Sequence, residues 1–150
     1  MLKESDNTST MGGYVNTGAY MRQLMDEYRS NLEEAMKSKG YQEISNSHGW
    51  IFHHTKEEGS RLTELAAVAK ITKQSMGALI AQLEVAGYLE KKPDPTDKRA
   101  SLLFLTAEGK KIRDLGRSIN YEFEKTWEQK LGPQDYEKFR SYLKKLCESD

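Results

Sequence analysis

Three hydrogen-bonding side chains stand together near the middle of the chain, at Lys73, Gln74 and Ser75. Ammonium, amide and hydroxyl groups in the first turn of a helix can donate hydrogen bonds to base edges in the major groove of duplex DNA. Gly77 and Ala78 follow, and such small residues let a helix backbone approach another surface closely. This spacing makes the segment a candidate for contact with DNA.

A second group of cationic side chains surrounds a proline-containing turn. Lys91 and Lys92 precede the turn, and Lys98 and Arg99 follow it. Four cations on one hairpin could face phosphates or the narrow, negative minor groove. We expect Asp97 to hold Arg99 in a fixed orientation.

Two short helices must position the first group. Their apolar residues repeat at the spacing of a helix face on either side of a break at Lys70 and Ile71. Thr63 and Thr72 stand where the two helices could start, because a threonine oxygen can accept a hydrogen bond from a free amide of the first turn. The two apolar rows are Leu62, Leu65, Ala66 and Ala69, and then Met76, Leu79, Ile80 and Leu83.

The second group requires a β-hairpin. Residues 88–92 and 100–105 have the pattern of two strands, and Gly87 suits the end of the preceding helix. We expect residues 93–99 to form the connecting loop, in which Pro93 and Pro95 stay outside the sheet.

Amphipathic stripes flank this central segment on both sides. They predict a long helix that ends before Gly40, a short helix over 46–54, a long helix after residue 109 and a last helix after Gly132 and Pro133. The long stripes are Met21, Leu24, Tyr28, Leu32 and Ala35; Ile112, Leu115, Ile119, Phe123 and Trp127; and Tyr136, Phe139, Leu143 and Leu146.

The central motifs resemble the winged helix-turn-helix of the MarR family of transcriptional regulators. The resemblance is carried by residues 62–66 (LTELA), 72–76 (TKQSM), 87–90 (GYLE), 93–100 (PDPTDKRA) and 105–109 (LTAEG). It implies a mainly α fold with a small antiparallel β-hairpin, flanked by N- and C-terminal dimerisation helices. Three positions depart from the family pattern: Gly77 and Ala78 replace a polar or basic pair found in many relatives, and Lys70 replaces a small residue.

The resemblance also sets the expected organisation of the chain. We expect residues 1–12 to be disordered and residues 13–150 to form a single domain. Its winged core would span about residues 45–109, and its dimerisation helices about 14–40 and 110–148.

The function implied by the resemblance is sequence-specific binding of double-stranded DNA by a homodimeric repressor. Two-fold symmetry predicts a pseudopalindromic operator with half-sites about one helical turn (~34 Å) apart. A protein-interaction module that uses the winged fold without reading DNA is the alternative. The predicted DNA-binding residues are Thr72, Lys73, Gln74, Ser75, Gly77, Ala78, Lys91, Lys98 and Arg99.

The family further implies release from DNA by a small aromatic or phenolic effector, bound between the dimerisation helices and the winged core. Candidate effector-binding residues lie where the first, second and fifth helices should approach this core. They are Tyr28, His48, Trp50, His54 and Ile112.

Histidines 48, 53 and 54 could suggest a metal site, because His53 and Glu57 have the four-residue spacing of two ligands on one helix. Gly59 indicates that the helix has already ended, and the ligand set is small. No nucleophile, base and orienting partner can be assembled either. We therefore expect no metal, no cofactor and no enzymatic activity.

Charge and composition agree with this interpretation. The 150 residues hold 23 Lys and Arg against 23 Asp and Glu, yet residues 61–111 hold nine against six. The single Cys147 excludes an internal disulfide. The polar first residues and the lack of an 18-residue apolar run lead us to expect a cytoplasmic protein without a membrane segment.

Overall fold

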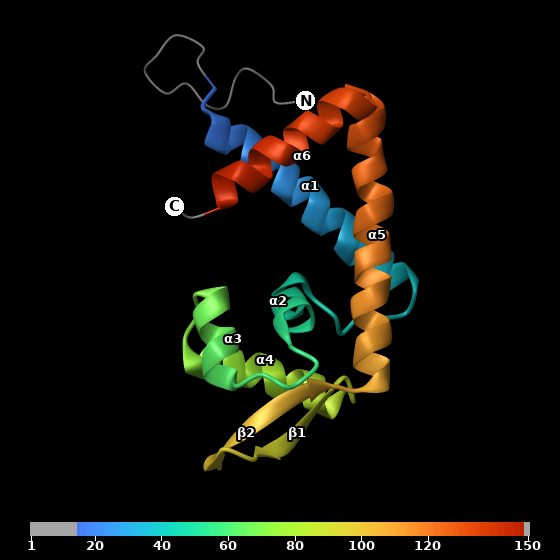
Figure 1. The fold of residues 1–150 in the computed structure, drawn as a ribbon. Helices are drawn as coiled ribbons and strands as arrows, with labels where there is room; N and C mark the ends of the chain where they lie inside the picture. Colours follow the sequence, from blue (N-terminus) through green and yellow to red (C-terminus); the bar gives the residue numbers. More distant parts are fainter. Residues whose placement is uncertain (1–14, 149–150) are drawn as a thin grey trace.

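The computed structural model describes residues 15–148, which form six helices and a two-stranded sheet (Figure 1). The predicted mainly α fold with a β-hairpin is confirmed, whereas the expectation for residues 1–12 lies outside the described residues. The elements are α1 (Thr17–Ser38), α2 (Asn46–His54), α3 (Leu62–Ala69), α4 (Lys73–Val85), β1 (Leu89–Asp94), β2 (Asp97–Leu105), α5 (Ala107–Leu131) and α6 (Pro133–Cys147).

The molecule has two regions joined by α5 (Figure 1). Helices α2, α3 and α4 and the β-hairpin gather around one end of α5, and we call residues 46–105 the head. Helices α1 and α6 both contact α5 toward its other end, and we call α1, α5 and α6 the arm. The long α5 therefore connects the two regions.

A threonine side-chain oxygen caps α4 at its predicted start, and another caps α5. Thr72 accepts a hydrogen bond from Ser75 N (3.1 Å) at α4, and Thr106 accepts one from Gly109 N (3.1 Å) at α5. The predicted cap at Thr63 is wrong, because Arg61 occupies the N-cap position of α3 and its backbone N–H donates to Glu64 Oε2 (3.4 Å). The acceptor comes from the third residue of the helix, so Glu64 binds the N-cap amide from inside the first turn.

Left-handed residues end α3 and α4. Gly87 has φ +81°, and the following Tyr88 donates from its backbone N to Leu83 O (2.9 Å), which is a Schellman arrangement. Lys70 takes the equivalent place after α3 with φ 54°, and Ile71 N donates to Ala66 O (3.1 Å). The lysine therefore stands in a conformation that glycine adopts at no steric cost.

The hairpin turn is much tighter than the sequence predicted. β1 extends to Asp94 and β2 begins at Asp97, so Pro93 pairs with Ser101 inside the sheet. The expected seven-residue loop is wrong, because the register shifts between Pro93 and Asp94 and residues 98–100 bulge from β2. A two-stranded sheet has only edge strands, and an edge strand with a bulge tolerates proline.

A single apolar core lies mainly in the head. The predicted rows of α3 and α4 supply much of it, and Met36 of α1 and Ile112 of α5 close it from the arm. Its other buried members are Ile44, Ile51, Phe52, Leu65, Ala66, Met76, Ile80, Leu83, Tyr88, Leu89, Leu103 and Leu105.

Candidate nucleic-acid interface

The first turn of α4 projects its polar side chains into solvent. Lys73, Gln74 and Ser75 are exposed, and Thr72 Oγ1 lies 2.9 Å from Ser75 Oγ. The two hydroxyls therefore bind each other, whereas among residues 15–148 the side chains of Lys73 and Gln74 make no hydrogen bond or ion pair. Free donors at the positive end of a helix dipole are suited to contact a polyanion.

The two small residues of α4 differ in position. Ala78 is exposed on the same side as Gln74, which is one turn earlier. Gly77 is half-buried and turns toward α3, because a Cβ added there would lie 3.7 Å from Leu62 Cδ1. DNA contact by Gly77 stays a prediction, and close packing against α3 is a second reason for a small residue there.

The four cations of the hairpin fall into two pairs. Lys91 Nζ lies 2.7 Å from Glu84 Oε2, and Lys92 Nζ lies 2.8 Å from Glu90 Oε1. Lys98 and Arg99 are exposed in the bulge of β2, and neither side chain has a carboxylate partner among residues 15–148. The hairpin tip therefore presents the cations that are available to another molecule.

Asp97 acts on the backbone of the bulge. Its Oδ1 accepts a hydrogen bond from Arg99 N (3.0 Å), so the predicted contact between Asp97 and Arg99 is present and is made through the backbone of Arg99. The carboxylate shapes the turn two residues ahead of it, as aspartate commonly does. The guanidinium of Arg99 stays free to point outward.

A pair that sequence reasoning missed joins the hairpin tip to α3. Arg61 Nε donates to Asp94 Oδ2 (2.8 Å), while Thr96 N donates to Asp94 Oδ1 (2.8 Å). Hydrogen bonds from Thr96 and then from Arg61 lower the pKa of Asp94 to about 2. The partners are 33 residues apart, so no local spacing in the sequence indicates the contact.

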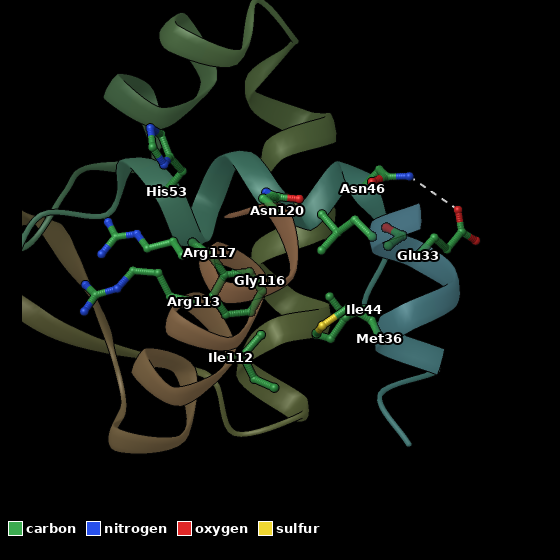
Figure 2. A pocket seen from close by; sticks show the side chains of 14 residues that line it. Glu33, Met36, Ile44, Asn46, His53, Ile112, Arg113, Gly116, Arg117 and Asn120 are labelled. Carbon is green, nitrogen blue, oxygen red and sulfur yellow. Dashed lines mark hydrogen bonds between the residues drawn. The ribbon is translucent and has the colours of Figure 1, made fainter. Parts of the chain in front are cut away.

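A cavity of about 100 Å³ lies between α1, α2 and α5 (Figure 2). Its wall is largely apolar, with Met36, Ile44 and Ile112, while Arg117 lies at one side. Asn120 Oδ1 is buried at this wall without a hydrogen-bond partner among residues 15–148. The cavity thus combines apolar surface with an acceptor that a ligand could satisfy.

Of the five candidate effector residues, only Ile112 lines this cavity. Tyr28 OH donates to Glu124 Oε1 (3.2 Å) in the arm, and Trp50 stacks on His54 with ring centroids 4.9 Å apart. These positions reflect tertiary packing that helix periodicity does not determine.

His48 is buried behind the cavity wall with both ring nitrogens occupied. Ser45 N donates to His48 Nδ1 (3.0 Å), so Nε2 carries the proton and donates to Gln82 Oε1 (2.9 Å). This histidine therefore joins the start of α2 to α4 and does not face the cavity.

The cavity edge carries an ion-pair network that the sequence did not suggest. Arg113 Nη1 lies 3.0 Å from Glu57 Oε1, and Lys110 Nζ lies 2.6 Å from Glu57 Oε2. Hydrogen bonds from Lys110 and Arg113 lower the pKa of Glu57. The network ties the segment after α2 to the first turns of α5.

Residues 15–148 contain no cluster of three or more potential metal ligands. Helix α2 ends at His54, so His53 and Glu57 do not share a helix face. Within the same residues, no helix is both long and apolar enough to cross a membrane.

Comparison with known proteins places residues 43–100 in the MarR family model. The transcriptional regulator HosA of Escherichia coli O111:H- is 28% identical over 88 residues, which cover 59% of this chain and 65% of that relative. The match thus spans less than two thirds of the relative.

Solved structures share the fold over nearly the whole chain. The transcriptional regulator Tm0710 of Thermotoga maritima is 25% identical with a TM-score of 0.62, covering 86% of this chain and 89% of its own. The Staphylococcus aureus MepR–DNA complex, at 20% identity, has a TM-score of 0.72 and covers 89% and 97%. This second likeness shows the fold alone.

Proposed function

We propose that the chain is a homodimeric transcriptional regulator of the MarR family that binds specific sequences of double-stranded DNA. One observation carries the proposal. The exposed donors of Lys73 and Gln74 and the exposed cations of Lys98 and Arg99 belong to one compact head. Such a head can insert α4 into the major groove while the hairpin reaches the adjacent minor groove or backbone.

A solved structure with the same fold supports DNA as the partner. MepR, which shares the fold, forms a complex with DNA. In the present chain, Gln74 would read base edges, and the hairpin cations would supply binding that depends on salt.

Exposed apolar side chains support the dimer. They lie on all three arm helices, which a second arm could cover in a two-fold assembly. Two heads related by this symmetry would bind a pseudopalindromic site. The exposed apolar residues of the arm are Tyr20, Met21, Met25, Tyr121, Leu131, Tyr142 and Leu146.

The cavity between α1, α2 and α5 is the proposed effector site. A small aromatic or phenolic molecule would pack on Ile44 and Ile112, and its hydroxyl group would donate to Asn120 Oδ1. Because α5 joins the cavity to the hairpin, binding could favour a head arrangement with lower operator affinity, which would release a repressor from its promoter.

Selection of bound fragments from genomic DNA, followed by binding titrations at several salt concentrations, tests the DNA proposal. Arg99→Ala should weaken binding and reduce the salt slope by about one unit, because one phosphate or groove cation is removed. Gln74→Ala should change the ranking of operator variants by about 1–3 kcal/mol for the base that it reads.

Arg22→Ala is the matched control, because it removes an exposed cation from α1 in the arm. Its salt slope should equal that of the unmodified protein. If no duplex is enriched in the selection at low ionic strength, DNA is not the partner, and the alternative of a protein-interaction module is favoured.

A further inference from the structure

The tip of the hairpin is fastened to the start of the helix-turn-helix by one buried carboxylate. Asp94 is only 5% exposed although it lies at a surface turn. Its Oδ2 accepts from Arg61 Nε (2.8 Å) and from Nη2, and its Oδ1 accepts from Thr96 N (2.8 Å) and Thr96 Oγ1 (2.7 Å). Both carboxylate oxygens are therefore saturated by contacts within the head.

The base of the hairpin is held by the adjacent residue. Ser60 N donates to Leu103 O (3.0 Å), and Leu103 N donates to Ser60 O (2.9 Å). Ser60 thus binds β2 near the base of the hairpin, and Arg61 binds the turn at its tip. Arg61 is also the N-cap of α3. Two consecutive residues fix the direction of the hairpin relative to α3 and α4.

We infer that Arg61 and Asp94 are positioning residues for DNA binding, which hold the hairpin so that Lys98 and Arg99 engage DNA at the same time as α4. The inference rests on the proposed function. Lys98 and Arg99 lie in the bulge that follows Asp97, the residue paired with Asp94 at the register shift, so the anchored carboxylate determines where the bulge points. Holding two contact groups in one geometry lowers the entropy that binding must lose.

Charge and position predict opposite effects for one substitution. Asp94→Asn removes a negative charge from the surface that would face a polyanion, so electrostatics alone predicts tighter binding. A positioning role predicts weaker binding, because an amide cannot replace a carboxylate that accepts from the Arg61 fork. The sign of the change in DNA affinity therefore distinguishes a positioning role of Asp94 from a purely electrostatic effect.

The experiment compares Asp94→Asn with Glu90→Gln on a selected operator. Glu90 is an exposed carboxylate of the same hairpin, and it contacts Lys92 away from the tip. We expect Asp94→Asn to weaken binding by about tenfold and to lower the salt slope by about one to two units, because Lys98 and Arg99 disengage. Glu90→Gln should bind as tightly as the unmodified protein or more tightly.

Unchanged or tighter binding by Asp94→Asn would overturn the inference. If the unmodified protein selects no operator, the proposed function fails instead, so the two failures are distinct. If Asp94→Asn does not fold, as judged by its thermal melt, Thr96→Ala takes its place. That variant should show a smaller loss in the same direction, and an unchanged affinity would count against positioning.

Arg61 variants distinguish positioning from direct contact with a phosphate. Arg61→Lys keeps the charge but loses the forked hydrogen bonds, so it should bind more weakly. The Arg61→Gln/Asp94→Asn double variant should bind DNA no more weakly than the weaker-binding of the two single variants, Arg61→Gln and Asp94→Asn. Both substitutions remove the same contact between Arg61 and Asp94. Full affinity in Arg61→Lys, or additive losses in the double variant, would assign Arg61 to a phosphate and overturn the inference.

Discussion

The head and the arm bury their apolar residues to very different extents. The head encloses a continuous core in which Ile51, Met76 and Ile80 have no exposed surface. In the arm, only Met36, Gly109, Ile112 and Tyr136 are buried, although its three helices contain 62 residues. The head closes its core within one chain, whereas the arm leaves apolar surface for another molecule.

This difference separates two kinds of amphipathic stripe. The stripes of α3 and α4 serve folding, because they meet each other and the hairpin inside the head. The stripes of the arm are longer and lie partly in solvent, so they suit association. A substitution in the head should therefore alter unfolding, and one in the arm should alter assembly.

The largest expected effect comes from emptying the head core. Ile80→Ala should lower the free energy of unfolding by about 2–5 kcal/mol, because it leaves a cavity among close-packed side chains. Leu146→Ala in the arm, where the side chain is 81% exposed, is the control. Urea unfolding at one fixed protein concentration measures both, and equal losses would contradict the comparison.

Two glycines of α5 test the same difference between head and arm, because one contacts the head and the other contacts the arm. A Cβ at Gly109 would lie 2.1 Å from Tyr88 O of the head, whereas one at Gly116 would lie 4.0 Å from Leu32 Cδ1 of the arm. Gly109→Ala should destabilise the protein by about 1–3 kcal/mol, because the backbone of the hairpin must shift. Gly116→Ala should stabilise it by up to about 1 kcal/mol through helix propensity. Thermal unfolding of the pair checks the opposite signs.

Local features were predictable from the sequence where short-range chemistry determines them. The predicted short helix over 46–54, the cap at Thr72 and the end of α4 at Gly87 all follow from neighbouring residues, and the structure confirms them. The prediction of a loop over 93–99 is wrong, because proline is typical of loops but also fits an edge strand next to a bulge. Pro93 pairs with Ser101, and the register shifts directly after it.

Contacts between distant side chains were not predictable in this way. The pairing of Arg61 with Asp94 and that of Glu57 with Arg113 depend on how the hairpin and α5 return to the head. His48 was expected near an effector because of its place on α2, yet the packing of α4 turned it toward Gln82. A single sequence specifies which face of a helix is apolar, but not which polar groups meet across the core.

A charge placed on the arm should break the assembly and leave the head intact. Tyr142 is 64% exposed on α6, and Tyr142→Glu should raise the dimer dissociation constant at least tenfold, or by about 1.4 kcal/mol. Val85→Glu is the control, because Val85 is 91% exposed on the head. Sedimentation equilibrium measures both variants, and a dimer that tolerates the Tyr142 change would remove this face from the proposed interface.

The smallest expected effect concerns the joint between α3 and α4 inside the head. Lys70 is the one described residue other than glycine with a positive φ, and this conformation costs an L-residue about 1–2 kcal/mol. Lys70→Gly should relieve that strain and stabilise the protein by about 0.5 kcal/mol, since part of the gain is offset by the larger entropy of the unfolded chain. Ala67→Gly, an exposed helical position three residues earlier, should instead destabilise it by about 1 kcal/mol. If urea unfolding shows a loss of stability in both variants, the lysine contributes contacts that outweigh its strained backbone.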